Sequence, residues 1–228
     1  MSLKQALCIG LSVLMLHSGT SIAHSHYRRA SNSTGSVITA NFDDLSPEEA
    51  ATALNTYSSL VYTDIEYKTF GINGTTLVGT PAPSKPNAAV YGSIQSLALS
   101  QGSYKADLPT IDPSISAGPG CSSFQLKSFY GACSLALPTG GFGIPIACDI
   151  TLTGYAEDGN IVDVQTYAFE PYGQLYSKFQ KFDTSDFKPV KTIKFETNGV
   201  LGEEIISTAL DNLEYVVNNG SGVGRRHL

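Results

Sequence analysis

The sequence predicts an all-β protein, an antiparallel β-sandwich of the jelly-roll type with at most one short helix. Two observations support this fold class. Short runs rich in β-branched and aromatic residues alternate between polar and apolar side chains, and clusters of Gly, Pro, Ser and Asn separate these runs. Helical spacing occurs only briefly, in residues 46–54, where Ser46 suits a helix cap. An up-and-down barrel is the alternative arrangement of the same strands.

The clearest hairpin spans residues 149–169, where two β-rich runs flank the turn Glu157-Asp158-Gly159-Asn160. Gly159 and Asn160 both tolerate the positive φ that a tight hairpin turn requires. Further strands are predicted at residues 36–42, 60–70, 87–100, 124–137, 146–155, 191–197 and 209–217.

The beginning of the chain predicts a secreted, extracellular protein. Lys4 precedes an apolar run over residues 6–16, and small residues follow at Ser21 and Ala23, which is the pattern of a signal peptide spanning 1–23. We divide the remainder into a flexible leader at 24–35 with a possible dibasic processing site at Arg28-Arg29, a β-sandwich domain at 36–217, and a flexible tail at 218–228.

The charge balance argues against two classes of partner. The chain carries 14 basic and 20 acidic residues, a net charge of −6, and loses one more positive charge with the signal peptide. An acidic chain without a larger basic cluster is a poor match for nucleic acid or anionic membranes. No later stretch is long and apolar enough to predict membrane insertion.

Three N-glycosylation sequons fit a secreted glycoprotein. They begin at Asn32, Asn73 and Asn219.

Three cysteines remain after removal of the signal peptide, so one disulfide and one leftover thiol are expected in an oxidising compartment. Cys133 and Cys148 each share a face with apolar residues of their strands, on either side of the Gly- and Pro-rich loop 138–145. We therefore predict the pair Cys133–Cys148, which leaves Cys121 free or available for a bond between molecules.

The residue types present predict a protein that is not an enzyme. Between Tyr27 and Arg226 there is no histidine, which excludes Ser-His-Asp and Cys-His nucleophiles and His-ligated zinc from this part of the chain. A glycosidase needs only two carboxylates and stays open as an alternative, although no pair of acids is placed across a cleft by the pattern.

Two acids continue apolar faces of predicted strands. Asp211 alternates with Leu213 and Tyr215, and Asp44 follows Ala40 and Phe42 in the same way. Both carboxylates are therefore expected to point inward, where an uncompensated charge is costly.

The order of several segments resembles that of a broad group of secreted, largely fungal, β-sandwich proteins. The segments are "ANFDDL", "YSSLVY", "SKPNAAVYG", "FQLKSFYGACSLAL", "CDITLTGYAEDGNIV" and "ALDNLEY". These proteins are similar to galactose-binding-like domains and carbohydrate-binding modules. The resemblance implies that the first and last strands are neighbours, and that the protein binds glycans or cell surfaces.

With those strands adjacent, Asp44 and Asp211 would lie together. Oxygen ligands suit Ca²⁺, with Asn212 or Asp43 and backbone carbonyls completing the shell, and the resemblance makes one structural calcium plausible there. The alternative is that Asp43 and Asp211 end their strands by accepting hydrogen bonds from nearby backbone amides.

Two kinds of partner remain open. A glycan-binding protein needs aromatic platforms, for which Phe142, Tyr172 and Tyr176 are loop-borne candidates, although the chain has no Trp. A secreted virulence effector or elicitor that binds a host protein fits the small size and the spare cysteine equally.

Overall fold

The structure is a computed structural model that describes residues 35–47, 52–70, 80–92, 111–136, 142–173, 175–199 and 206–219. All of them belong to one compact unit, Ser33–Leu228. Two antiparallel sheets form a β-sandwich and the described residues contain no helix, which confirms the predicted fold class. The predicted signal peptide, leader residues 24–34, tail residues 220–228 and helix residues 48–51 lie outside the described residues.

The first sheet contains eight strands in the order β12-β8-β14-β6-β5-β2, with β1 paired to β14 and β9 paired to β8. Its strands are β1 (Ile38–Ala40), β2 (Thr52–Ala53), β5 (Glu66–Thr69), β6 (Asn87–Tyr91), β8 (Cys121–Ala136), β9 (Phe142–Pro145), β12 (Gln180–Asp183) and β14 (Ile206–Asn219).

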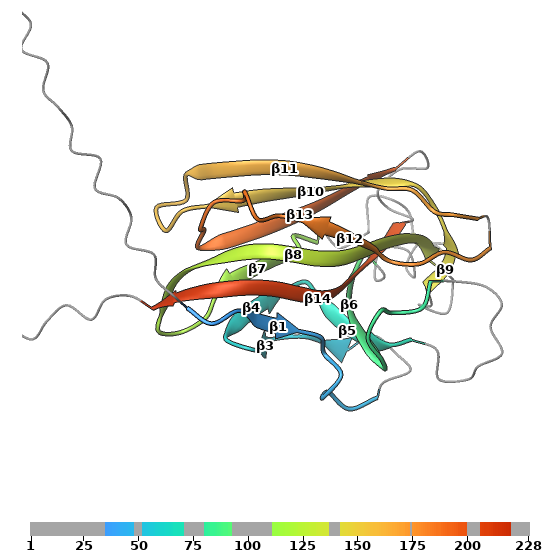
Figure 1. Cartoon of the computed structure of the whole chain (residues 1–228), viewed down its shortest axis with the longest axis horizontal. Helices are drawn as coiled ribbons and strands as arrows, with labels where there is room; N and C mark the ends of the chain where they lie inside the picture. The colour runs from blue at the N-terminus through green and yellow to red at the C-terminus, as the bar shows by residue number, and fades with distance from the viewer. Residues whose placement is uncertain are drawn as a thin grey trace, which may run out of the picture. The chain divides into compact units, whose positions relative to one another are not determined.

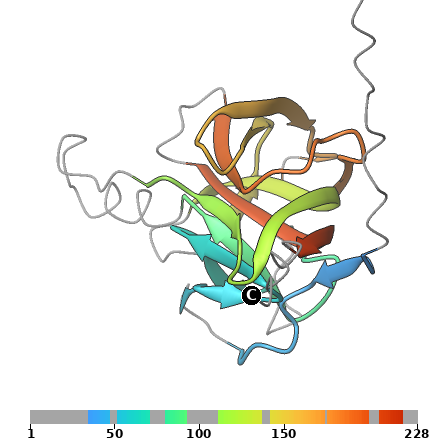
Figure 2. The same ribbon diagram turned by 90° about the vertical axis from the view of Figure 1, so that its left-hand side faces the viewer.

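The second sheet contains six strands in the order β11-β10-β13-β7-β4-β3. They are β3 (Thr56–Tyr57), β4 (Leu60–Thr63), β7 (Ser114–Ala117), β10 (Cys148–Tyr155), β11 (Ile161–Phe169) and β13 (Thr192–Gly199). Figure 1 shows β10, β11 and β13, in yellow to orange, lying over β8 and β14 of the first sheet. Figure 2 shows the same two layers from one end.

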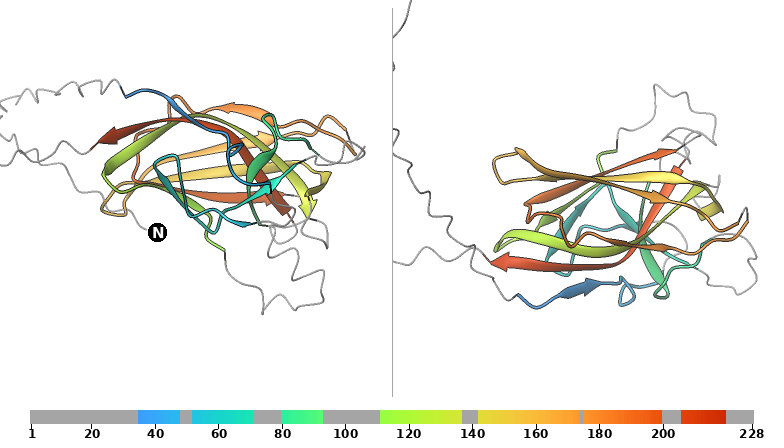
Figure 3. Two further views of the ribbon diagram at one scale, coloured as in Figure 1. Left: turned by 90° about the horizontal axis from the view of Figure 1, so that it is seen from below. Right: turned by 45° about the horizontal axis from the view of Figure 1, so that its top comes forward.

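Strand β14 is the centre of the first sheet. It pairs with β8 along one side, from Ile206↔Leu135 to Asn219↔Cys121. Its other side is shared by two strands, because the pairing with β6 stops at Leu210↔Ala89 and the pairing with β1 starts at Leu213↔Ala40. Figure 3 shows β1, in blue, beside β14, in red. This pairing confirms that the first and last described strands are adjacent.

The predicted hairpin at 149–169 is confirmed as the antiparallel pair β10–β11. Of its two turn candidates only Gly159 has a positive φ, 81°. Asn160 instead donates from its backbone and side-chain nitrogens to the Asp158 carboxylate, at 3.1 and 2.8 Å. Asn160 therefore holds the turn by hydrogen bonding rather than by a left-handed backbone.

The prediction of one strand at 60–70 is wrong, because this segment forms β4 in the second sheet and β5 in the first. The short strands were not predicted either, and several boundaries differ. Strands β2, β3, β7 and β12 have only two to four residues each. Thr52 and Ala53, expected within the helix at 46–54, form β2 against the edge of β5. The loop 138–145 contains β9, which pairs with β8, and β14 continues beyond the expected boundary at 217 to Asn219. Strands this short form because a neighbouring strand offers free backbone groups. The alternation of side chains within one segment cannot predict such a neighbour.

Aromatic side chains of both sheets meet in the core. Phe129 of β8 packs edge-to-face against Tyr167 of β11, with ring centroids 5.6 Å apart, and lies 5.2 Å from the ring of Phe182 in β12. Such pairs contribute about 0.5–1.5 kcal/mol beyond the burial of their surface. This contact holds β11 and β12, one edge strand of each sheet, close to each other.

The predicted disulfide Cys133–Cys148 is confirmed, and it joins the two sheets. Cys133 lies on β8 and Cys148 on β10, both are buried, and their Cα atoms are 6.3 Å apart. Cys121 at the start of β8 is free and partly exposed.

Loss of this disulfide should destabilise the protein. The 15-residue separation corresponds to about 3 kcal/mol in the loop-entropy model. We expect Cys133→Ser to lower the free energy of unfolding in urea by about that amount, whereas Cys121→Ser should change it little. Non-reducing peptide mapping that linked Cys121 to either partner would contradict the assignment.

The turn between β3 and β4 has an unfavourable backbone for its sequence. Tyr57 pairs with Leu60, so Ser58 and Ser59 form a two-residue turn, with φ of 46° and 69°. A positive φ at both positions is the type I′ geometry that Asn-Gly adopts most readily.

Replacing the turn by Asn-Gly should stabilise the protein. The double change Ser58→Asn/Ser59→Gly removes left-handed strain worth about 1–2 kcal/mol per residue, so the urea midpoint should rise. Ser59→Val, at the same exposed position, should lower it because a β-branched side chain resists positive φ. An unchanged midpoint for both variants would show that the turn is unstrained.

Candidate functional site

The predicted metal residues divide between the interior and the surface. Asp211 is fully buried, as expected from its strand pattern. Asp44 is exposed, where its carboxylate accepts a hydrogen bond from the Tyr57 hydroxyl at 2.6 Å, so the prediction that Asp44 points inward is wrong. The cause is that β1 ends at Ala40 and that the φ of 61° at Phe42 breaks the alternation that residue 44 was expected to follow.

Asp43, not Asp44, is the acid that faces Asp211. Its negative charge is one of the influences on the Asp211 carboxyl, and its Oδ1 accepts the backbone N–H of Asn87 at 3.2 Å. Asn212 has a φ of 46°, and its backbone N–H donates to Asp211 Oδ1 at 2.7 Å. The structure therefore brings Asp43, Asp211 and Asn212 together and leaves Asp44 outside.

Asp211 is held mainly by Ser84, a residue that the sequence did not single out. Ser84 donates its backbone N–H to Oδ2 at 3.0 Å, and its hydroxyl lies 2.9 Å from both carboxylate oxygens. Asn87 lies next to them, fully buried, and donates from Nδ2 to the carbonyl oxygens of Phe42 and Leu45. We call Asp43, Ser84, Asn87 and Asp211 the strand-junction cluster.

Burial raises the pKa of Asp211 from 3.8 to about 7. The hydrogen bonds from Ser84 and Asn212 act in the opposite direction by stabilising the carboxylate, and the charge of Asp43 adds to the rise. No ion pair of Asp211 exists among the described residues. Burial is thus the dominant influence on its charge.

The predicted calcium at this place stays a prediction. Within the described ranges no group of three or more His, Cys, Asp and Glu side chains could hold a metal ion. The nearby carbonyl oxygens have partners of their own, since those of Phe42 and Leu45 accept hydrogen bonds from Asn87 Nδ2. Both Asp211 oxygens already accept hydrogen bonds, which is the arrangement expected in the alternative without a metal.

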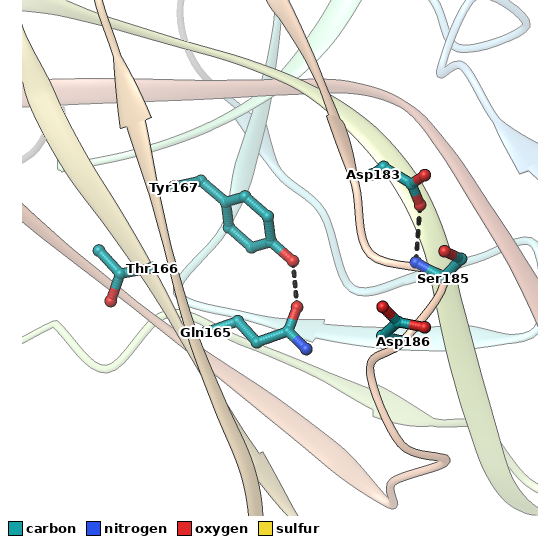
Figure 4. A pocket seen from close by; sticks show the side chains of 6 residues that line it. All are labelled: Gln165, Thr166, Tyr167, Asp183, Ser185 and Asp186. Carbon is teal, nitrogen blue, oxygen red and sulfur yellow. Dashed lines mark hydrogen bonds between the residues drawn. The ribbon is translucent and has the colours of Figure 1, made fainter.

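A second polar region is an open hollow of about 500 Å³ between β11 and the segment that follows β12. Figure 4 shows the six side chains that line it: Gln165, Thr166, Tyr167, Asp183, Ser185 and Asp186. We call it the edge groove, because β11 and β12 are the edge strands of the two sheets.

Hydrogen bonds fix part of the edge groove. The Tyr167 hydroxyl donates to Gln165 Oε1, and the backbone N–H of Ser185 donates to Asp183 Oδ1 at 2.8 Å (Figure 4). The Asp186 carboxylate accepts no hydrogen bond from any residue that the structure describes. Gln165 and Asp183 are therefore oriented in advance, while Asp186 offers both oxygens to a ligand.

The charge of the edge groove is negative. The Ser185 backbone N–H and hydroxyl lower the pKa of Asp183, which keeps its carboxylate ionised at neutral pH. The pKa of Tyr167 rises to about 12, chiefly through burial and further through the charges of Asp183, Asp163 and Asp186. At neutral pH Tyr167 is accordingly a neutral hydroxyl beside acidic groups.

The predicted ligand aromatics do not line the edge groove. Tyr172 and Tyr176 are 83% and 47% exposed and, with Leu175 at 55%, lie on the segment between β11 and β12. Phe142 begins β9, and its side chain lies outside the description. Asn219 is exposed at the end of β14, whereas Asn32 and Asn73 lie in parts of the chain not described.

No helix in the described part of the chain has the length and hydropathy to cross a membrane. No protein-family model matches the sequence, and no curated protein matches it.

Several solved structures of bacterial all-β proteins resemble the chain. A DUF4465 family protein from Bacteroides caccae has a TM-score of 0.48 and 13% identity, over 84% of this chain and 97% of that one. The K1 cleaved adhesin domain of Lys-gingipain from Porphyromonas gingivalis has a TM-score of 0.39 and 11% identity, over 82% and 100%. A DUF4465 family protein from Bacteroides ovatus has a TM-score of 0.43 and 10% identity, over 80% and 94%. None of the three is described as fungal, galactose-binding-like or a carbohydrate-binding module, so that part of the resemblance stays a prediction.

Calcium binding at the strand-junction cluster can be tested by melting. If the folded protein alone binds the ion, a hundredfold excess over the dissociation constant adds about 2.7 kcal/mol of stability. A chelator should then lower the melting temperature at neutral pH, and Asp211→Asn should abolish most of the difference. Equal melting of the wild-type protein in chelator and in excess calcium would contradict the metal.

Proposed function

We propose that the protein is a secreted, non-enzymatic β-sandwich that binds glycans of a cell wall or cell surface, with the edge groove as its binding site. The observation that supports this most is the composition of the groove. An open hollow of about 500 Å³ is lined by carboxylates, an amide, hydroxyls and one tyrosine.

These groups match the chemistry of a sugar. Each sugar hydroxyl both donates and accepts hydrogen bonds, and carboxylates and amides are its strong protein partners. Asp183 and Asp186 supply acceptors, Gln165 supplies an amide, and Ser185 supplies a hydroxyl that can take either role. Tyr167 adds an aromatic ring beside them, although its contacts with Phe129 and Phe182 bury part of that ring.

The backbone beneath the groove supports binding without large rearrangement. Gln165, Thr166 and Tyr167 lie on β11, whose pairing with β10 continues through all three residues. Asp183 ends β12, and Ser185 follows it in a turn held by the Asp183 carboxylate. Side chains on paired strands keep their spacing, which lowers the entropy lost on binding.

The charge state of Asp183 favours binding over hydrolysis. A glycosidase needs one carboxylic acid that stays protonated near neutral pH to protonate the leaving group. The pKa of Asp183 is lowered, which is the opposite of that requirement. The groove therefore offers a good acceptor in Asp183 and a poor general acid.

A second candidate function is recognition of a host protein through the aromatic segment between β11 and β12. Tyr172, Leu175 and Tyr176 are all exposed within five residues. Tyrosine is enriched at protein interfaces because it combines a large apolar ring with a hydrogen-bonding end. This segment would serve a secreted effector or elicitor.

A pull-down on a panel of insoluble polysaccharides tests the proposal. We expect at least one polysaccharide to retain the protein, with retention at least tenfold weaker for the double variant Gln165→Ala/Asp186→Ala. The matched control is Tyr172→Ser/Tyr176→Ser, which changes exposed side chains outside the groove and should bind as the wild type does.

The pattern of losses separates the two candidates. If the polysaccharide retains the groove variant but no longer retains the tyrosine control, the aromatic segment is the binding site and not the edge groove. Failure of the wild-type protein to bind any polysaccharide would contradict glycan binding. Gln165→Ala removes the acceptor of the Tyr167 hydroxyl, so the melting temperature of the double variant is measured beside its binding, and a loss of binding supports the groove only if the variant is folded.

A further inference from the structure

The outer edge of β11 carries backbone groups that point away from its one partner strand. β11 pairs with β10 on one side, and no described strand pairs with it on the other. The N–H of Val164 donates to the Asp163 carboxylate at 3.0 Å, and both backbone groups of Glu170 bond to the side-chain amide of Gln180. Val164 and Glu170 therefore turn their backbone groups away from β10.

Thr166 and Ala168 lie between those two residues and point the same way. Backbone groups of residues two apart in a strand face the same side, and the register with β10 is regular over residues 163–169. No residue that the structure describes bonds to the backbone N–H or C=O of Thr166 or Ala168. These four groups are therefore available to a further strand.

Side chains close the edge on either side of these groups. At one end the amide of Gln180 takes the place of a neighbouring strand for Glu170. At the other end the Lys188 ammonium donates to the carbonyl oxygen of Val162 at 3.2 Å. Between them the edge is open over residues 164–168, which we call the open window. Its length suits a short extended segment rather than a whole strand of another sheet.

The edge groove forms an acidic wall beside the open window. The Tyr167 ring lies 5.4 Å from that of Phe182 in the first sheet, and Asp183 and Asp186 line the groove next to it (Figure 4). None of the described residues that line the groove is Lys or Arg. Because side chains alternate between the two faces of a strand, every second side chain of an added segment would face these carboxylates.

We propose that the open window binds an extended basic peptide by strand addition, with the peptide backbone paired to Thr166 and Ala168 and its Lys or Arg side chains on Asp183 and Asp186. In such complexes the main-chain hydrogen bonds give affinity, and alternate side chains give specificity. The inference goes beyond glycan binding and does not depend on it, because it uses the backbone of β11. A peptide and a glycan would exclude each other from the groove.

A second copy of the chain fits the open window less well. Antiparallel pairing of two β11 strands across Thr166 would bring the Asp183 and Asp186 carboxylates of both copies to the same side of the joint. Like charges that face each other across an interface are costly, whereas a basic peptide compensates them. The charge of the groove therefore favours a basic peptide over a second copy.

Peptide binding to the full chain, read out with amide hydrogen exchange, tests the proposal. The probe is an array of acetylated pentapeptide amides that alternate Lys or Arg with Val, Ile or Thr. In a matched acidic array Asp or Glu replaces each basic residue. We expect basic members to bind at least about tenfold more tightly than their acidic counterparts. Binding should slow exchange of the Thr166 and Ala168 N–H groups about tenfold or more, while the N–H of Tyr167, which faces β10, stays protected throughout.

Variants separate the backbone contribution from the charge. Thr166→Pro removes the donor at the centre of the open window, on the side away from β10 where an edge strand tolerates proline, and should abolish binding. Thr166→Ala retains that N–H and should bind as the wild type does. Asp183→Asn/Asp186→Asn should remove the preference for the basic array.

Three results would overturn the proposal. They are failure of every basic peptide to bind, equal binding by Thr166→Pro and Thr166→Ala, and protection of the Thr166 and Ala168 N–H groups in the free protein. If Thr166→Pro does not fold, peptides that are N-methylated at alternate residues decide with the wild-type protein. Methylation of one alternating set should abolish binding and methylation of the other should not, so equal binding of both kinds would exclude strand addition.

Discussion

Strand β14 is the element on which the rest of the structure depends, because three strands use its backbone. It is paired with β8 from Ile206 to Asn219 on one side, with an interruption after Asp211, and with β6 and then β1 on the other. The buried residues Ala209, Leu210, Leu213 and Tyr215 anchor it in the core. A change that shifted β14 by one residue would move all three neighbours and turn its apolar face outward.

The two polar regions of the molecule differ in how their hydrogen bonds are used. In the strand-junction cluster the donors and acceptors face one another, and Asn87 alone bonds to Thr69, Phe42 and Leu45. Such groups contribute to a defined structure because leaving any of them unpaired is costly. In the edge groove Asp186 has no hydrogen-bond partner among the described residues, so its carboxylate is open to a ligand. The first arrangement suits structure and the second suits recognition.

Alternation of side chains was sufficient to predict the long strands and what they bury. It placed Cys133 and Cys148 in the core and Asp211 on an apolar face, because each lies within a strand regular enough for the period of two to hold. It failed at Asp44 because the positive φ of Phe42 interrupts the period of two. A positive φ is uncommon for a bulky residue, so the sequence gives no reason to expect one at a phenylalanine. The edge groove was not predictable in this way, because its two walls, at residues 165–167 and 183–186, are brought together only by the packing of one sheet on the other. Ser84 was missed because it bonds to Asp211 from a loop that lies 127 residues earlier in the chain, a contact that no local pattern records.

The position of β14 in the chain has a consequence for biosynthesis. The strands that flank it, β1, β6 and β8, are all made earlier, and the contacts that close the sheet join residues as far apart as Ile38 and Tyr215. While the ribosome is still adding residues before 206, these strands expose unpaired edges to neighbouring chains. Folding of the first sheet must wait for β14, and sequence separations of this size slow the final step. The nascent protein is therefore expected to depend on chaperones that shield strand edges more than a protein built from local hairpins would.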